Sequence, residues 1–356
     1  MPLNYQKKLA ELMVLAAQQG ASDLHISVGK HPTVRIDGNL VPVSHEPILT
    51  PEMVAGLVSA LLTPEQQDKL ITEKDIDFAF SYEDKIRFRV NVYFQRGYLA
   101  AALRLIPGHV RTIEELNLPP ILHEVSKYNQ GFFLIVGPAG HGKTTTMAAI
   151  VDEINHKRMD HIITIEDPIE YTYTQDRALI DQREVGTDTI SFHRGLRSVL
   201  RQDPDVIVIG EMRDPESMAI ALTAAETGHL VLSTLHTNSA SQTIDRIIDS
   251  FPSDQQAQIR AQLSTTLIGI VSERLVPRIS GGRIPACEIM FATPAIKNLI
   301  RERKTYQIDL IIETSTEEGM ISLNRSLVEL VRRREISLET AESYSLNPSE
   351  LRQLLG

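Results

Sequence analysis

The sequence predicts an α/β protein in two parts, a small α+β domain followed by a larger domain with a parallel sheet. Alternating apolar residues recur in the first 107 residues, whereas short, fully apolar runs alternate with helical stretches after residue 120. A glycine-rich loop joins one of these runs to a helix. Strands that are apolar on both faces are typical of a parallel sheet covered by helices on both sides.

Composition and charge limit the class of protein. The chain has 356 residues, 42% hydrophobic and 23% charged, which predicts about two globular domains and excludes disorder. The net charge of −10 disfavours non-specific binding to nucleic-acid phosphates. The one cysteine, Cys287, excludes an intrachain disulfide and is expected to be a buried thiol. Neither a signal peptide nor an apolar run of about 20 residues is found, so we expect a cytoplasmic protein.

The first part opens with an amphipathic helix that ends at Gly20. Its apolar residues recur at helical spacing: Leu9, Leu12, Met13 and Ala16. Alternating residues over 24–36 lead into Asp37-Gly38, which predicts a hairpin because its tight turn needs positive φ. Pro42 predicts that the returning strand lies at a sheet edge.

A second helix and a longer hairpin complete this part. The helix carries Leu57, Leu61 and Leu62. The hairpin runs from Ile86 to Ile106 with its turn at 95–97. We therefore expect an α+β domain over 1–107 and, from the prolines at its ends, a linker over 108–120.

From residue 121 the pattern changes to apolar runs separated by helical stretches. The expected buried strands are 132–136, 162–166, 196–200, 206–210 and 230–235. A helix to about Ile154 follows the first strand, and helical spacing prevails after Pro294. These patterns predict a sheet domain over 121–293 and a helical C-terminal subdomain, a cap on the sheet domain, over 294–356.

The segment GPAGHGKT at 137–144 lies between a strand and a helix and fits the pattern G-x-x-x-x-G-K-[ST]. Backbone N–H groups of such a loop, with the start of the helix, bind phosphates. Lys143 is expected to reach the β- and γ-phosphates of a nucleotide, and the Thr144 hydroxyl to bind Mg²⁺. The predicted nucleotide-binding residues are Gly137, Pro138, Ala139, Gly140, His141, Gly142, Lys143, Thr144 and Thr145.

Carboxylates follow two other predicted strands, at the sheet edge where ligands bind in α/β folds. Glu211 is the main catalytic candidate, because it can orient or deprotonate the attacking water and contact Mg²⁺ through water. A solvated carboxylate at a strand end is the alternative. Glu166 and Asp167 can extend this network, although a turn cap before Pro168 also explains them.

Two histidines flank the strand at 230–235. His236 follows the strand and can donate a hydrogen bond to the γ-phosphate. His229 lies at the opposite end and reaches the site only through tertiary structure, so a structural role explains it equally well.

Three arginines lie on the long N-terminal hairpin. Arg87 and Arg89 share one strand face because side chains alternate, and Arg104 lies on the returning strand. An external arginine accelerates phosphoryl transfer by ~10³–10⁵. Arg89 and Arg104 are therefore candidate catalytic arginines, and a solvated basic face is the alternative. Arginines carried by a separate domain imply action on a neighbouring subunit, and hence a ring.

Seven segments together carry a family resemblance. They are ASDLHI (21–26), RFRVN (87–91), GPAGHGKTTT (137–146), IEDPIEY (165–171), RQDPDVIVIGEMRD (201–214), GHLVLSTLHTNSA (228–240) and AIKNLIRE (295–302). They are similar to motifs of the secretion-ATPase superfamily and, within it, of the PilT family of type IV pilus retraction ATPases. The last segment resembles the signature of retraction members. Assembly relatives usually carry a four-cysteine zinc insert, which a single cysteine cannot form.

The resemblance implies a PAS-like N-terminal domain and a RecA-like ATPase domain, assembled as a homohexamer that uses ATP and Mg²⁺. It implies that Glu211 is the catalytic glutamate, assisted by Glu166, and that His229 and His236 form a histidine box. It also implies that the catalytic arginines come from the hairpin that contains residues 87–91. It also implies a ring at the inner-membrane face of the pilus machinery. There it acts on the platform protein, in pilus retraction and twitching motility.

The chain departs from the family pattern in places. Ala139 and His141 stand where Thr and Ser are more usual, and Lys297 replaces Arg. Because backbone groups make most loop contacts, we expect ATP binding to persist. His141 can slow turnover or impose a pH dependence near its titration range.

Two alternatives remain open. A RecA-like nucleic-acid translocase needs basic loops with interleaved aromatic residues, whereas this chain has no Trp and 5% aromatic residues. The second is an accessory ATPase that assists another retraction ATPase, although Lys143 and Glu211 are both intact.

Overall fold

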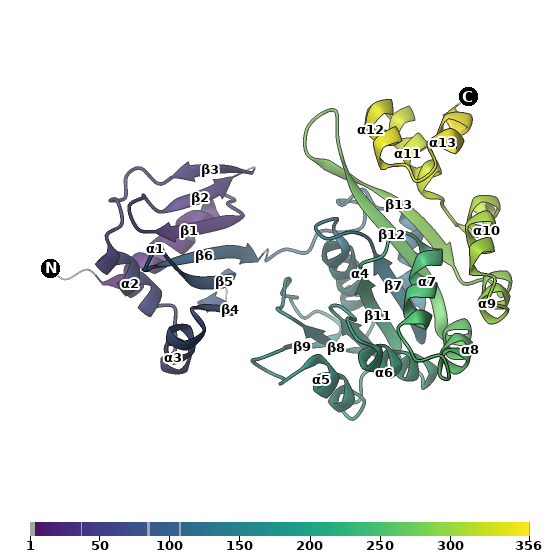
Figure 1. The fold of residues 1–356 in the computed structure, drawn as a ribbon, viewed down its shortest axis with the longest axis horizontal. Helices are drawn as coiled ribbons and strands as arrows, with labels where there is room; N and C mark the ends of the chain where they lie inside the picture. The colour runs from purple at the N-terminus through teal and green to yellow at the C-terminus, as the bar shows by residue number, and fades with distance from the viewer. Residues whose placement is uncertain (1–3, 37, 84–85, 107, 356) are drawn as a thin grey trace. The chain divides into compact units, whose positions relative to one another are not determined.

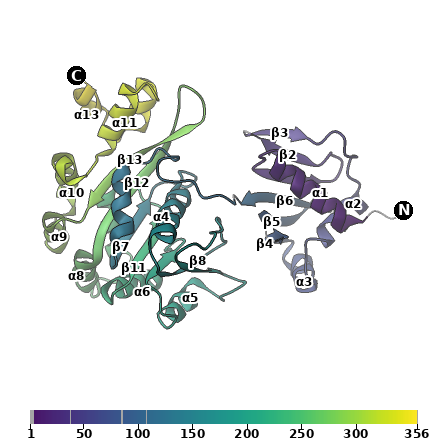
Figure 2. The ribbon, with the colours of Figure 1, turned by 180° about the vertical axis from the view of Figure 1, so that it is seen from behind.

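The computed structural model describes residues 4–36, 38–83, 86–106 and 108–355 (Figures 1 and 2). The chain divides into two compact units, each with its own sheet. The first comprises Met1–His109 with the short segment Pro168–Thr172, and the second comprises Val110–Asp167 with Tyr173–Gly356.

The first unit contains a six-stranded antiparallel sheet in the order β3-β2-β1-β6-β5-β4. Its strands are β1 (Asp23–Ser27), β2 (Thr33–Ile36), β3 (Asn39–Pro42), β4 (Asp75–Tyr82), β5 (Ile86–Gln95) and β6 (Tyr98–Ile106). Its helices are α1 (Tyr5–Gln18), α2 (Pro51–Ser59) and α3 (Pro64–Glu73). Helices α1 and α2 pack on the apolar face of the sheet.

Local sequence explains the main features of this unit. The four apolar residues predicted for α1 are all buried, and Gly20 follows the helix with φ +63°. The β2–β3 hairpin is confirmed, since Ile36 pairs with Asn39 and β3 is an edge strand. Gly38 lies in its turn with φ +83°, while Asp37 lies outside the described residues. The second hairpin turns at Arg96 and Gly97, both with positive φ.

Sequence reasoning missed α3 and β4. The segment 75–82, DIDFAFSY, does alternate, but its acidic first half obscured the pattern. It pairs with residues 86–93 of β5 and places Phe78 opposite Val90. Pro107, the predicted end of the α+β domain, lies outside the described residues.

The second unit contains a seven-stranded sheet in the order β13-β12-β7-β11-β10-β8-β9. All pairings are parallel except that of β12 with β13. The strands are β7 (Gly131–Val136), β8 (His161–Glu166), β9 (Leu179–Glu184), β10 (Val206–Ile209), β11 (Leu230–Leu235), β12 (Leu267–Pro277) and β13 (Arg283–Phe291). The predicted parallel strands β7, β8, β10 and β11 are confirmed at the centre of this sheet.

Helices cover both faces of this sheet, as predicted. Phe132, Leu134 and Val136 join a core on the side of α5–α10, whereas Phe133 and Ile135 join a core with α4 and η1. The elements are η1 (Pro120–Lys127), α4 (Lys143–Lys157), α5 (Phe192–Val199), α6 (Pro215–Glu226), α7 (Ala240–Asp249) and α8 (Gln256–Thr266). Cys287 of β13 is a buried free thiol, as expected.

One predicted strand is wrong. Residues 196–200 lie in and after α5, which begins at its N-cap Ser191. Leu196 and Val199 are three residues apart and are both buried, so this short apolar segment follows the helical period rather than that of a strand.

The C-terminal residues form short helices, as the pattern after Pro294 predicts. They are α9 (Pro294–Arg301), η2 (Thr305–Gln307), α10 (Ile308–Thr314), η3 (Thr316–Glu318), α11 (Leu323–Arg332), α12 (Leu338–Tyr344) and α13 (Pro348–Leu355). Helices α11–α13 share a small core with Val276 of β12 and Ile284 of β13. Among the described residues, no helix is long and apolar enough to cross a membrane.

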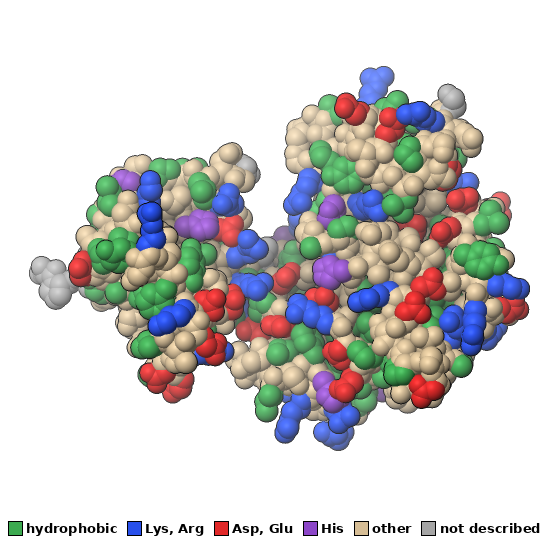
Figure 3. All heavy atoms as spheres, viewed as in Figure 1, with side chains coloured by type: hydrophobic (Ala, Val, Ile, Leu, Met, Phe, Trp, Pro, Cys, Tyr) green, Lys and Arg blue, Asp and Glu red, His purple; other side chains and the backbone are tan. Residues whose placement is uncertain are grey.

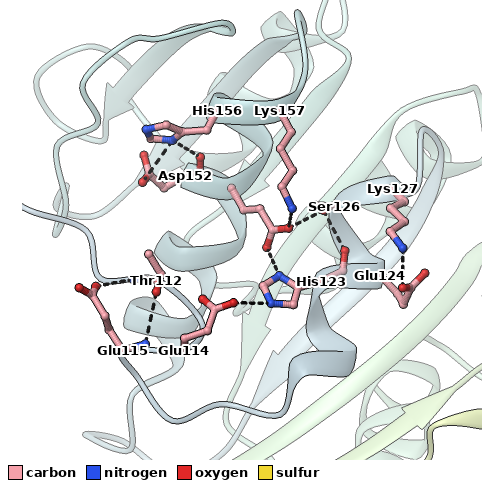
Figure 4. A network of polar contacts seen from close by, with 11 residues as sticks. Thr112, Glu114, Glu115, His123, Glu124, Ser126, Lys127, Asp152, His156 and Lys157 are labelled. Carbon is pink, nitrogen blue, oxygen red and sulfur yellow. Dashed lines mark hydrogen bonds and ion pairs between the residues drawn. The ribbon is translucent and has the colours of Figure 1, made fainter.

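The segment before β7 is anchored to α4 by a polar network (Figure 4). The ring of His123 in η1 contacts Glu153 of α4 through Nδ1 and Glu114 through Nε2, both at 2.8 Å. Glu153 also accepts a hydrogen bond from Ser126. The hydrogen bond and charge of Glu153, opposed by burial and helped by Glu114, raise the pKa of His123.

Candidate active site

The phosphate loop begins where β7 ends and runs into α4. Gly137 and Gly142 both have positive φ, and Gly142 is the residue directly before the helix. A side chain at Gly137 would overlap the carbonyl oxygen of Glu273, so the close approach of β12 also requires glycine there. The loop therefore has the backbone conformation that directs N–H groups and a helix start towards an anion.

The amine of Lys143 lies inside this loop, and the residue is only 7% exposed. Its Nζ donates to the carbonyl oxygens of Gly137 and Pro138, each at 2.9 Å. These bonds hold the ammonium group inside the loop, from which it can reach the phosphates of a nucleotide.

His236 connects the phosphate loop to Glu211. Its Nδ1 lies 3.2 Å from Lys143 Nζ, and its Nε2 lies 3.2 Å from Glu211 Oε1. A neutral ring protonated on Nε2 satisfies both contacts, since it accepts from the ammonium group and donates to the carboxylate. Arg213 Nε donates to the other oxygen of Glu211 at 3.0 Å. The structure thus brings together three of the predicted site residues, Lys143 at the start of α4, Glu211 after β10 and His236 after β11.

Glu166 occupies the end of the next strand, β8, and is 6% exposed. Its Oε1 accepts hydrogen bonds from Thr164 Oγ1 at 2.6 Å and from Gln182 Nε2 at 3.1 Å. Asp167, by contrast, is exposed. Glu166 therefore lies beside the strand that leads to Glu211, as part of a buried polar layer.

His229 lies at the other end of the sheet. It precedes β11, whereas His236 follows that strand, and six residues separate them at about 3.3 Å each. The ring Nδ1 of His229 contacts the carbonyl oxygen of Ala224 in α6 at 2.9 Å. The structure does not bring His229 to the phosphate loop.

The candidate arginines lie on the polar face of the sheet in the first unit. Arg89 and Arg104 are directly opposite on β5 and β6. Arg104 Nε lies 3.0 Å from Asp23 Oδ1 and its side chain is 69% exposed, while Arg89 Nε lies 4.0 Å from Asp77 Oδ1. Burial opposes ionisation of Asp23, but hydrogen bonds from Ser22 and Arg104 hold its pKa below the usual value. A charged, accessible strip therefore crosses this sheet, with Arg87 on the same face.

Sequence reasoning missed a support that β12 and β13 give to the phosphate loop. Glu273 accepts a hydrogen bond from Thr146 Oγ1 at 2.7 Å, and the backbone N–H of Leu275 donates to His141 Nδ1 at 3.0 Å. Arg283 donates to the carbonyl oxygen of Gly140 at 3.3 Å. A glutamate between two apolar stretches, 267–271 and 275–276, is the sequence signal that could have drawn attention to this strand.

His141, the unusual loop residue, is thereby given a structural partner. Burial lowers its pKa, and the nearby charges of Arg274, Arg283 and Lys143 lower it further. The neutral ring is the form that accepts the N–H of Leu275.

The donor groups fit a nucleotide with Mg²⁺. Thr144 presents a hydroxyl at the first turn of α4, next to Lys143. In the described part of the chain, no group of three His, Cys, Asp or Glu side chains could hold a metal by itself. The Thr144 hydroxyl is an oxygen donor of the kind that Mg²⁺ commonly takes, in addition to phosphates and waters.

Comparisons with known proteins agree with this site. A model of the family described as "Type II/IV secretion system protein" matches residues 4–342. The chain is 44% identical over 345 residues to the type IV pilus retraction ATPase PilT of Pseudomonas aeruginosa, covering 96% of this chain and 98% of the relative. It is 40% identical over 321 residues to a twitching motility protein of Neisseria gonorrhoeae, covering 90% and 86%.

A solved structure agrees as well. The crystal structure of the pilus retraction motor PilT with bound ADP matches with a TM-score of 0.91 at 44% identity, covering 99% of each chain. The fold is therefore the α/β fold of secretion ATPases, and the phosphate loop belongs to a nucleotide-binding site. This chain belongs to the family of type II/IV secretion system proteins and is an ATPase of the PilT type.

Proposed function

We propose that this chain is the ATP-hydrolysing subunit of a homohexameric motor for type IV pilus retraction. The motor works in the cytoplasm, at the inner-membrane face of the pilus machine, on its platform protein. The observation that carries the catalytic part is His236, which contacts both Lys143 in the phosphate loop and Glu211 beyond the neighbouring strand. Similarity over nearly the whole chain to a pilus retraction ATPase supports the assignment to retraction.

In this proposal the triphosphate lies on residues 137–145, and Lys143 exchanges its two carbonyl partners for phosphate oxygens. Thr144 and, through water, Glu211 would hold Mg²⁺, which would neutralise charge on the phosphates. Glu211 orients the attacking water and accepts its proton as the bond between the γ-phosphorus and ADP breaks. His236 keeps the Glu211 carboxylate in place and is close enough to sense the γ-phosphate.

Two further predicted residues have supporting positions. Glu166 accepts hydrogen bonds from Thr164 and Gln182 at the end of β8, next to the strand that leads to Glu211, and assists Glu211 from there. His229 contacts Ala224 at the far end of β11, so its effect on hydrolysis passes through that strand.

Arg89 and Arg104 complete the site of a neighbouring subunit in the ring. Their accessible positions support this role, because a guanidinium group on an open sheet face can leave its aspartate for a phosphate. We divide the chain accordingly into a PAS-like domain over 1–107, a linker over 108–120, an ATPase domain over 121–293 and a C-terminal subdomain over 294–356.

The test uses the purified full chain and two variants. Lys143→Ala is expected to abolish ADP binding, because it removes the phosphate-binding ammonium group. Glu211→Gln is expected to bind ADP as the wild type does but to release no phosphate from ATP. Hydrolysis at the wild-type rate by Glu211→Gln would remove Glu211 from the catalytic role.

The same assay separates this proposal from a nucleic-acid translocase. Figure 3 shows basic and acidic side chains mixed over the drawn face of the second unit, rather than a single basic stripe. We expect single-stranded DNA to leave phosphate release unchanged. Strong stimulation by DNA would favour the translocase.

A further inference from the structure

Glu273 is a buried acid directly beneath the phosphate loop. Strand β12 runs parallel to β7, and Ser272 pairs with Val136, the last residue before the loop. Glu273 therefore lies where the loop begins, and its residue is 1% exposed. None of the proposed catalytic steps uses this carboxyl group.

The two carboxyl oxygens have different surroundings. Oε2 accepts the hydrogen bond from Thr146 Oγ1 in the first turn of α4. Oε1 is buried without a hydrogen-bond partner among the described residues. It lies 3.0 Å from the position that a Cβ atom at Gly142 would occupy, so it faces the loop at the start of the helix. A buried oxygen without a hydrogen bond destabilises the folded state, unless the carboxyl group is protonated or gains a new hydrogen-bond partner.

Several titratable or charged groups surround Glu273. Burial raises the pKa of Glu273 to about 7, while the Thr146 hydrogen bond and the charge of Lys143 on α4 oppose that rise. On β13 the residue opposite is Cys287, a buried thiol whose pKa is raised by burial and by Glu273. His141 of the loop bonds to Leu275, two residues further along β12. The ionised carboxylate is thus stabilised by the Thr146 hydrogen bond and, after it, by the charge of the Lys143 ammonium group.

Nucleotide binding changes this balance. Phosphates attract the Lys143 ammonium group and bring negative charge to the opposite side of the loop from Glu273. Both changes disfavour a second negative charge beneath the loop. We propose that Glu273 is a positioning residue that supports the phosphate loop from beneath and takes up a proton when nucleotide binds. This inference rests on the proposed nucleotide site.

The sign and size of the effect follow from linkage. At about pH 7 a carboxyl group with this affinity is half protonated, and bound phosphates drive it towards full protonation, so uptake reaches about half a proton. Because binding takes up a proton, and the proton concentration falls as pH rises, nucleotide affinity falls as pH rises through this range. Glutamine at this position accepts from Thr146 but does not titrate, so its affinity lacks this dependence.

Isothermal titration calorimetry of the full chain with ADP measures the uptake, from the observed enthalpy in two buffers of different ionisation enthalpy at one pH. Protons that ADP itself gains or loses contribute equally to the wild type and to each variant, so they cancel in the difference between two proteins. The wild type is expected to take up about half a proton more than Glu273→Gln at about pH 7. Equal uptake by the two proteins overturns the proposal.

Glu288 provides a matched control. It lies one residue after Cys287 on β13, is buried, bonds to the backbone N–H of Ala240, and also has a pKa raised by burial to about 7. Glu288→Gln is expected to keep the wild-type proton uptake, because its carboxyl group lies on the other side of the strand. An equal loss in Glu288→Gln overturns a specific role of Glu273. If the wild type does not bind ADP at all, the proposed nucleotide site fails instead.

The supporting role has its own readout. Thr146→Val removes the hydroxyl that bonds Glu273 and is expected to weaken ADP binding by about 2- to 10-fold, whereas Thr146→Ser retains it. Equal ADP affinity in both variants would exclude support through this bond.

Discussion

His236 contacts both Lys143 of the phosphate loop and Glu211, the proposed catalytic glutamate, so its removal has a calculable effect. In the proposed mechanism Lys143 binds the phosphates of ATP, and the remaining contact of His236 is that of Nε2 with Glu211 at 3.2 Å. A hydrogen bond to a charged group contributes about 1.5–3 kcal/mol. If His236→Ala loses this contribution in the transition state, kcat falls by about 10- to 150-fold.

The assay is phosphate release at saturating ATP, with ADP affinity measured in parallel. His236→Gln retains a donor near the position of Nε2 and is expected to recover part of kcat, whereas His236→Asn places its polar atom near Nδ1 and is not. His193→Ala serves as the control, since His193 lies on α5 and pairs with Glu216. Wild-type kcat in His236→Ala, with folding intact, would refute the reasoning.

Two further predictions concern the other histidines. His229→Ala removes the contact with Ala224 and is expected to cost about 1 kcal/mol of folding stability. Thermal unfolding measures this change, and a loss of kcat as large as that of His236→Ala contradicts it. His123 has a raised pKa, so its contacts stabilise fully below its unfolded value of about 6.5 and less as pH rises through the folded value. His123→Leu should therefore lower the melting temperature more at about pH 6 than at about pH 9. An equal decrease of the melting temperature at both pH values would contradict a stabilising contact between charged His123 and Glu153.

The central strands of the second unit could be predicted because each is apolar on both faces. Strand β9 could not, since LIDQRE is an edge strand that pairs only with β8, and it contains four consecutive polar residues, of which Glu184 alone is buried. The strand predicted over 196–200 is wrong because three apolar residues among five, in LRSVL, do not distinguish the helical period from that of a strand. Boundaries between short elements are set by tertiary packing, which periodicity does not contain.

The site was predictable where a motif fixes it and not where partners come from distant segments. The loop and Glu211 follow from strand-end positions, but the bridging contacts of His236 require β10 and β11 to be neighbours. The role of Glu273 could not be predicted, because its partner Thr146 is 127 residues away in sequence. Asp23 likewise becomes a partner of Arg104 only through the pairing of β1 with β6.

Mixing two inactive variants tests most directly whether two subunits complete one site. Arg104→Ala keeps the phosphate loop and Lys143→Ala keeps the arginine, so a mixed ring contains interfaces with both. In a random equal mixture about a quarter of the interfaces are complete, and phosphate release is expected to recover to about that fraction of the wild-type value. No recovery, with mixed rings shown to assemble, would contradict the account.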